Sequence, residues 1–140
     1  MTTAGWEHFE HQADIGLRAW GPDLATALEQ AGVALTAVVT EPETVEATQA
    51  VALECTAADP EFLLVEWLDA LIYAMATRRM LFATYEVHLD GLDLHATAFG
   101  EPVDRDRHAP AVEVKGATLT GLKAEPGADG AWRLECVVDV

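Results

Sequence analysis

The stretch Asp59-Pro60-Glu61-Phe62-Leu63-Leu64-Val65-Glu66-Trp67-Leu68 combines a helix start with a strongly apolar pattern of helical period. Asp59 suits an N-cap, Pro60 suits the first turn, and Glu61 lies near the positive end of the helix dipole. Because the apolar residues cover much of the circumference, we expect this to be the central and most buried helix, ending near Arg79. The apolar stripe comprises Leu63, Leu64, Trp67, Leu68, Leu71, Ala74 and Met75.

A second helix is predicted after Gly21-Pro22-Asp23, which has the residues of a turn and a helix start. It extends to about Val39 and ends before Thr40-Glu41-Pro42. Its apolar residues recur at helical spacing and predict an amphipathic helix. These residues are Leu24, Leu28, Ala31, Leu35 and Val38.

Strand patterns fill most of the remaining chain. Asp90-Gly91 is typical of a two-residue hairpin turn, and residues 100–110 read as a charged loop. Two main helices packed on a mostly antiparallel or mixed sheet define an α+β, two-layer fold class. Because no linker is evident, we expect a single domain over residues 1–140. The predicted strands cover residues 6–10, 14–20, 43–57, 84–89, 92–99, 111–122 and 131–138.

The chain carries a net charge of −16, from 24 acidic and 8 basic residues. Such a surface repels phosphate backbones, so we expect no strong direct binding to nucleic acid. Three interpretations of the charge stay open. It can keep the protein soluble or reflect a salt-adapted host, it can attract a basic protein partner, and it can gather cations.

No apolar run approaches the roughly 20 residues that span a bilayer, and the first residues lack the basic and apolar regions of a secretory signal. We therefore expect a cytoplasmic protein without membrane association. Cys55 and Cys136 form no zinc-binding pattern and lie in apolar, strand-like stretches. In a reducing compartment both are expected to be buried free thiols.

Three separate segments carry the candidate site residues: His11-Gln12-Ala13-Asp14-Ile15-Gly16, Glu113-Val114-Lys115-Gly116-Ala117-Thr118 and the final pair Asp139-Val140. The run before Asp139 is apolar enough to be tied into a sheet. If the fold brings both ends of the chain together, two carboxylates and the oxygens of the terminus would form a site for a hard divalent cation, with Lys115 nearby.

These three segments, in this order and against the C-terminus, resemble the archease family, whose members assist an RNA ligase of the tRNA-splicing type. The helical run 63–68 and the step Phe99-Gly100-Glu101 also resemble the family. The resemblance spans nearly the whole chain and implies an archease-like fold.

The resemblance implies roles for four residues. Asp14 falls on the family's metal-binding aspartate, Asp139 supplies a second carboxylate, and Val140 is carried over as a main-chain ligand. The implied cofactor is a divalent cation, Ca²⁺ above all, with Mg²⁺ and Mn²⁺ as alternatives. Lys115 matches a functionally important lysine of the family, so Asp14, Lys115 and Asp139 are the residues expected to activate the partner.

Two histidines are candidates for a supporting role beside the ligands. His11 precedes Asp14 by three positions, and because oxygen-rich sites prefer hard ligands, we expect it to form hydrogen bonds there and not to bind the cation. His108 resembles a family histidine in the charged loop. Glu101 and Asp104 in the same loop are expected to be surface charges.

The chain departs from the family pattern at three positions. Gln12 stands where a threonine is common, and Leu119 and Thr120 stand where an aromatic residue and a histidine are common. The role of that histidine therefore has no counterpart in this chain. These departures bear on partner specificity more than on the fold.

No P-loop, nucleophile elbow or dinucleotide fingerprint occurs in the sequence. The resemblance implies an accessory protein, not an enzyme, that activates a tRNA-splicing RNA ligase by promoting its GTP-dependent guanylylation and multiple turnover. GTP and RNA would then be met only through this protein partner. A stand-alone metal-dependent hydrolase and a general protein chaperone are the alternatives.

Overall fold

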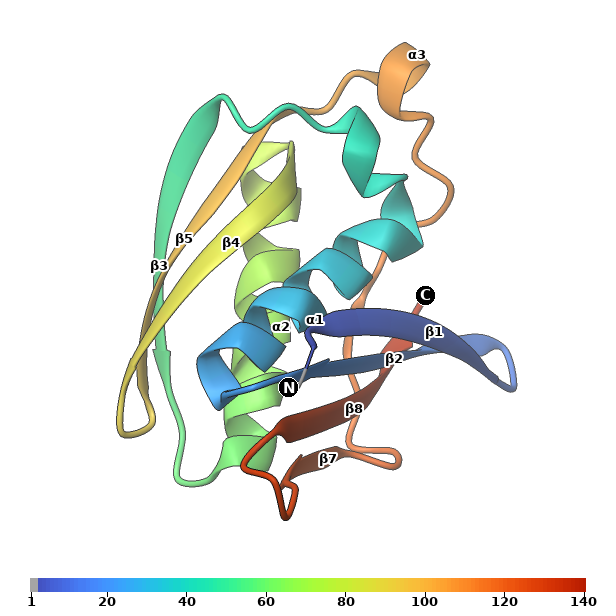
Figure 1. Ribbon diagram of the computed structural model, residues 1–140. Coiled ribbons are helices and arrows are strands. Elements are labelled where there is room, and N and C mark those ends of the chain that lie inside the picture. The colour runs from blue at the N-terminus through green and yellow to red at the C-terminus, as the bar shows by residue number, and fades with distance from the viewer. Residues whose placement is uncertain (1–2) are drawn as a thin grey trace.

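The computed structural model describes residues 3–140, in which two long helices are flanked by strands (Figure 1). The long helices are α1 (Leu24–Val39) and α2 (Pro60–Arg78), and the connecting segments contain the 3₁₀ turn η1 (Pro42–Thr44) and the short α3 (Arg105–His108). The strands, in chain order, are β1 (Gly5–His11), β2 (Asp14–Gly21), β3 (Gln49–Thr56), β4 (Met80–Asp90), β5 (Asp93–Pro102), β6 (Gly116–Ala117), β7 (Lys123–Pro126) and β8 (Trp132–Asp139).

The strands form two antiparallel sheets. One has the order β1-β2-β8-β6, with β7 also paired to β8, and the other has the order β3-β5-β4. Both long helices contact strands of both sheets, and Figure 1 shows the helices between them. The expected α+β class, with two main helices and antiparallel strands, is confirmed, although the strands divide between two sheets where one was expected.

Helix α2 begins at the predicted cap, and α1 begins directly after the predicted turn Gly21-Pro22-Asp23, with Asp23 as its cap. The Asp23 carboxylate accepts a hydrogen bond from the Thr26 N–H at 2.7 Å, and the Asp59 carboxylate accepts one from the Phe62 N–H at 2.8 Å. Helix α2 ends at Arg79, whose φ of 54° is left-handed. Within residues 3–140, no helix has the length and apolar character needed to cross a membrane.

Helix α1, and not α2 as expected, buries the larger share of its residues. Nine of the 16 residues of α1 are buried, against six of the 19 of α2. Small residues of α1 allow a close approach: a Cβ added to Gly32 would lie 2.8 Å from the Tyr85 ring. Helix α1 is therefore enclosed between β2 and β4, whereas α2 leaves Phe62 and Tyr73 exposed by 49% and 71%.

Trp67 connects the two long helices with the three-stranded sheet. Its side chain is fully buried, its Nε1 donates to the Leu28 carbonyl at 2.8 Å, and its ring meets the Tyr85 ring edge-on. Thr36 Oγ1 donates to the Phe82 carbonyl at 2.9 Å and lies 2.7 Å from the Tyr85 hydroxyl. The polar groups of this core contact are therefore paired, as burial requires.

Two predicted strands are partly wrong. The segment predicted at 43–57 begins with η1, which Pro42 starts, and becomes β3 only at Gln49. Within the segment predicted at 111–122, only β6 pairs with β8. Residues 111–115 instead run beside the C-terminal ends of α1 and α2, where the Ala111 N–H donates to the Val39 carbonyl at 2.8 Å.

Cys55 and Cys136 are free thiols, as predicted. Cys136 is buried and Cys55 half-buried, and this burial raises the pKa of each thiol to about 11. Both are therefore protonated and weakly reactive at neutral pH.

We expect Trp67→Ala to lower the free energy of unfolding by about 3–5 kcal/mol, because it opens a cavity in the core. Urea-induced unfolding followed by circular dichroism measures the change. Tyr73→Ala is the matched control on the same helix: its side chain is 71% exposed, and the expected change is within about 0.5 kcal/mol. Equal losses of unfolding free energy in the two variants would contradict the conclusion that Trp67 packing stabilises the core.

Candidate functional site

The candidate site lies at one end of the five-stranded sheet, where strand pairing brings distant segments together. In the β2–β8 pair, Ile15 lies opposite Val138. One further step in this antiparallel register places Asp14 opposite Asp139, and Gly116 of β6 pairs with Asp139 from the other side. The fold therefore brings the two ends of the chain together, as the cation-site hypothesis requires.

Asp14 and Asp139 lie on the outer face of this sheet, away from the helices. Side chains alternate along a strand, and the buried Leu17 of β2 defines the inner face, so Asp14 shares the outer face with Arg18. Arg18 Nε donates to Glu135 of β8 at 2.7 Å across this outer face. By the same alternation, Asp139 lies on the side of β8 that carries Glu135.

Phe9 of β1 covers the middle of the outer face. A Cβ added to Gly16 would lie 2.2 Å from the Phe9 ring, so glycine there leaves room for the ring. The Arg18 guanidinium lies 4.5 Å from the centroid of the same ring. The glycine of the first motif thus has a packing role that does not depend on a ligand.

His11, Asp14 and Asp139 occupy one cross-strand position, which we name the carboxylate row; His11 pairs directly with Asp14 in β1–β2. Like charges opposite each other destabilise a sheet unless something offsets them. Across residues 3–140, no hydrogen bond or ion pair engages the two carboxylates, and no group of three or more His, Cys, Asp or Glu side chains is arranged to hold a metal. A cation at the row would therefore also need main-chain oxygens.

Lys115 and Val140 lie one step from the carboxylate row. The Lys115 N–H donates to the Asp139 carbonyl at 2.8 Å, and its side chain is exposed. Val140 is half-buried and packs against the hydrophobic core, so the last residue does not project freely into solvent. Both residues are thus held at the end of the sheet that carries the row.

Asp69 of α2 contributes to this arrangement and was missed in the sequence. Its Oδ1 accepts a hydrogen bond from the Ala117 N–H at 2.9 Å, which fastens β6 to α2. The only available signal was an aspartate interrupting an apolar helix, and nothing in the spacing linked it to residue 117. Through this contact α2 positions Lys115 beside β8.

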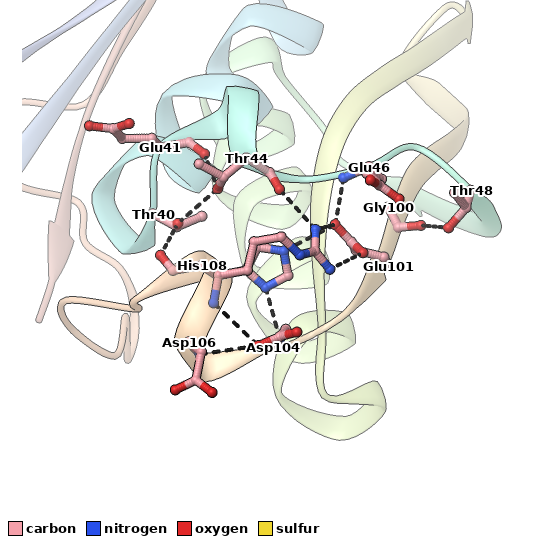
Figure 2. A network of polar contacts seen from close by, with 11 residues as sticks. Thr40, Glu41, Thr44, Glu46, Thr48, Gly100, Glu101, Asp104, Asp106 and His108 are labelled. Carbon is pink, nitrogen blue, oxygen red and sulfur yellow. Dashed lines mark hydrogen bonds and ion pairs between the residues drawn. The ribbon is translucent and has the colours of Figure 1, made fainter.

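His108 belongs to a separate polar network, shown in Figure 2. The residue is only 3% exposed; its Nδ1 accepts from the Asp104 N–H at 2.8 Å, and its Nε2 lies 3.0 Å from Glu101 Oε2. Because Nδ1 acts as an acceptor, Nε2 carries the proton and donates to the carboxylate. Both ring nitrogens are engaged here, so the structure does not bring His108 to the carboxylate row.

Glu101 is buried, which corrects the expectation that it is a surface charge. Its carboxylate accepts two hydrogen bonds from Arg107, at 2.6 and 2.7 Å, and a third from the Glu46 N–H at 2.6 Å. These bonds, those from Arg107 above all, hold the pKa of the Glu101 carboxyl far below its usual range. Asp104 is exposed as expected, and its side chain caps α3.

The three positions that depart from the family pattern are all exposed. Gln12 lies in the two-residue turn between β1 and β2 with a left-handed φ of 54°. Leu119 is 62% exposed, and Thr120 is exposed beside it. Their side chains are therefore placed to meet a partner without altering the core.

Comparison with known proteins gives a consistent result. The model of the Archease protein family (MTH1598/TM1083) matches residues 6–140. The protein archease of Pyrococcus abyssi is 35% identical over 139 residues, covering 96% of this chain and 98% of that protein. The protein archease of Methanopyrus kandleri is also 35% identical over 139 residues, covering 96% and 99%. The solution structure of Methanobacterium thermoautotrophicum protein 1598 superposes with a TM-score of 0.83 at 32% identity, covering 97% of this chain and 99% of that one.

We expect Glu101→Gln to destabilise the protein at neutral pH and to reduce its sensitivity to acid. The pKa of the folded Glu101 carboxyl lies below the ordinary value of 4.5. The stability that this group contributes is therefore fully present above that value and is lost as the pH falls through it toward the lower folded pKa. Urea unfolding of wild type and variant at neutral pH and at about pH 3 measures the difference, which should shrink in acid.

Glu125→Gln is the control, because it removes the same charge from an exposed residue of β7. We expect it to have little effect at either pH. A stability difference between wild type and Glu101→Gln that is the same at both pH values would contradict the role given to the Glu101 carboxylate.

Proposed function

The chain belongs to the archease family, and from that premise we propose that it is an accessory protein of a tRNA-splicing RNA ligase and not itself an enzyme. It promotes the GTP-dependent guanylylation of the ligase and allows repeated turnover. GTP and RNA reach it only through the ligase. The observation that supports this most is the carboxylate row at the end of the five-stranded sheet, with Lys115 one step away.

The carboxylate row is proposed to hold a divalent cation, Ca²⁺ above all, with Mg²⁺ and Mn²⁺ as alternatives. The carboxylates of Asp14 and Asp139 and a main-chain oxygen of Val140 would hold it, and these are the hard ligands such ions prefer. The two carboxylates occupy neighbouring register positions, and a cation would offset their repulsion. When bound, the ion supplies positive charge that neutralises phosphate oxygens.

The residues around the row have complementary tasks in this proposal. Lys115 offers a mobile positive charge that can meet a phosphate of the nucleotide. His11 lies opposite Asp14 in the β1–β2 register, from where it would orient that carboxylate by a hydrogen bond once the cation is bound. The row is assigned to the surface that enters the ligase active site.

The charge of the protein supports a protein partner. With a net charge of −16, the chain repels free RNA but is attracted to a ligase whose active-site cleft is basic enough to bind RNA and GTP. We place this function in the cytoplasm, apart from membranes, and assign it to residues 1–140 acting as one domain.

Calcium affinity tests the cation site. We expect Asp14→Asn to weaken Ca²⁺ binding at least about tenfold, because it removes one of two carboxylates from the row. Isothermal titration of the purified protein with calcium chloride measures the affinity. Asp90→Asn is the control, because it removes the same charge from an exposed residue at the end of β4. Similar affinities for the two variants would argue against the site.

Ligase turnover tests the activity. With the ligase of the same cell kept substoichiometric to RNA, we expect the wild-type protein to sustain multiple rounds of joining with GTP and divalent metal. Asp139→Asn and Lys115→Gln should leave about one round, because each removes a charge that meets the cation or the phosphates. Unchanged turnover with and without the wild-type protein would refute the accessory role. Chelator-sensitive hydrolysis of a phosphoester by the protein alone would favour the hydrolase alternative.

A further inference from the structure

A second surface feature lies beside the segment that leads to Lys115. It is an open groove of about 850 Å³ between the C-terminal part of α2 and residues 103–114. Most of its lining residues are apolar, among them Ile72, Met75, Val112 and Val114, and polar atoms contribute about as much of its exposed surface as apolar atoms do. Val112 is 38% exposed, so its apolar side chain is accessible to a ligand in the groove.

The walls of this groove are held by hydrogen bonds from both sides. The Val103 N–H donates to the Arg79 carbonyl at 2.9 Å, and the Ala111 N–H donates to the Val39 carbonyl at 2.8 Å. The Glu101 network holds the intervening α3 in place. A surface built this way is largely formed before a ligand arrives, which lowers the entropic cost of binding.

The charge of the groove is opposite to that of the protein as a whole. Two of the chain's eight basic residues, Arg79 and Arg105, line it, against one acidic residue, Glu113. Both arginines are exposed, and within residues 3–140 neither takes part in an ion pair. In a chain with a net charge of −16, these two arginines form a local basic rim around an apolar floor.

We propose that this basic-rimmed groove docks an acidic, apolar segment of the partner protein. Apolar side chains of that segment fill the floor between α2 and residues 110–114, and its carboxylates pair with Arg79 and Arg105. The identity of the partner as the ligase rests on the function proposed above. Docking here would tether the ligase beside the carboxylate row, since residues 112–114 lead directly to Lys115.

Two other occupants fit the groove less well. A second copy of this chain would bring another net charge of −16 against the first, which opposes association. A nucleic acid strand would place phosphates over an apolar floor in a strongly acidic protein. An acidic segment with apolar side chains complements both parts of the groove, because its apolar side chains pack on the floor and its carboxylates pair with the arginines of the rim.

Charge reversal at the rim tests the proposal in the full-length protein. We expect Arg79→Glu/Arg105→Glu to weaken binding to the ligase at least about tenfold in isothermal titration. The matched control is Lys123→Glu/Arg133→Glu, which changes the net charge equally at exposed residues of β7 and β8. Thermal unfolding of both variants checks that the fold is kept. Val112→Asp places a charge on the floor and should weaken binding as well.

The outcomes separate the groove from the proposed function. If the wild-type protein neither binds the ligase nor supports its turnover, the proposed function fails, and the assignment of the groove to this partner fails with it. If wild type binds and activates, but rim and control variants bind equally well, the docking proposal alone is overturned. The proposal of two separate surfaces, the groove and the carboxylate row, is supported by two results together. The rim variant loses more affinity for the ligase than the control variant does, and Asp14→Asn still binds the ligase but does not activate it.

Photo-crosslinking identifies the occupant. With benzoylphenylalanine introduced at position 112, irradiation of the complex should join the groove to a ligase segment that contains both carboxylates and apolar side chains. Mass spectrometry of the crosslinked peptide reads the segment. A basic ligase segment, or a crosslink to a second copy of this chain, would overturn the proposal.

Discussion

The antiparallel pairing of β2 with β8 is the contact on which the candidate site depends. It joins the beginning and the end of the chain in one register, so that Asp14 comes opposite Asp139. Because strand side chains alternate, a slip of one residue would turn one carboxylate to the other face. The register is held on the outer face by the Arg18–Glu135 ion pair at 2.7 Å, and on the inner face by packing of the buried Leu17 in the core.

Local signals in the sequence predicted the helices well, because a cap and an apolar stripe depend only on near neighbours. Long-range features were harder to predict. Residues 111–115 have a strand pattern, but β8 is already flanked by β2 on one edge and by β6 and β7 on the other. Glu101 resembled a surface charge because its partner Arg107 meets it only after the chain turns through α3. The site residues were predicted to converge only if the chain ends met, a condition that spacing cannot test.

The two functional surfaces proposed for this chain are mechanically linked. Residues 103–114 border the basic-rimmed groove, and the chain then continues through Lys115 to β6 beside the carboxylate row. This segment is anchored at its start by the Glu101 network and at its end by the hydrogen bond from Ala117 to Asp69. A protein that delivers a cation to a partner's active site needs one site that carries the cation and a separate surface that binds the partner. In this chain the segment connects the carboxylate row with the basic-rimmed groove.

The central claim is that Asp14 and Asp139 act as one cation site because the β2–β8 register places them opposite each other. A double-mutant cycle on Ca²⁺ affinity, using Asp14→Asn, Asp139→Asn and the double variant, tests it most directly. Substitutions at residues that share a site do not have additive effects on affinity, so the double variant should lose little more Ca²⁺ affinity than either single variant. Losses that simply add, or single variants that bind calcium as wild type does, would contradict the account.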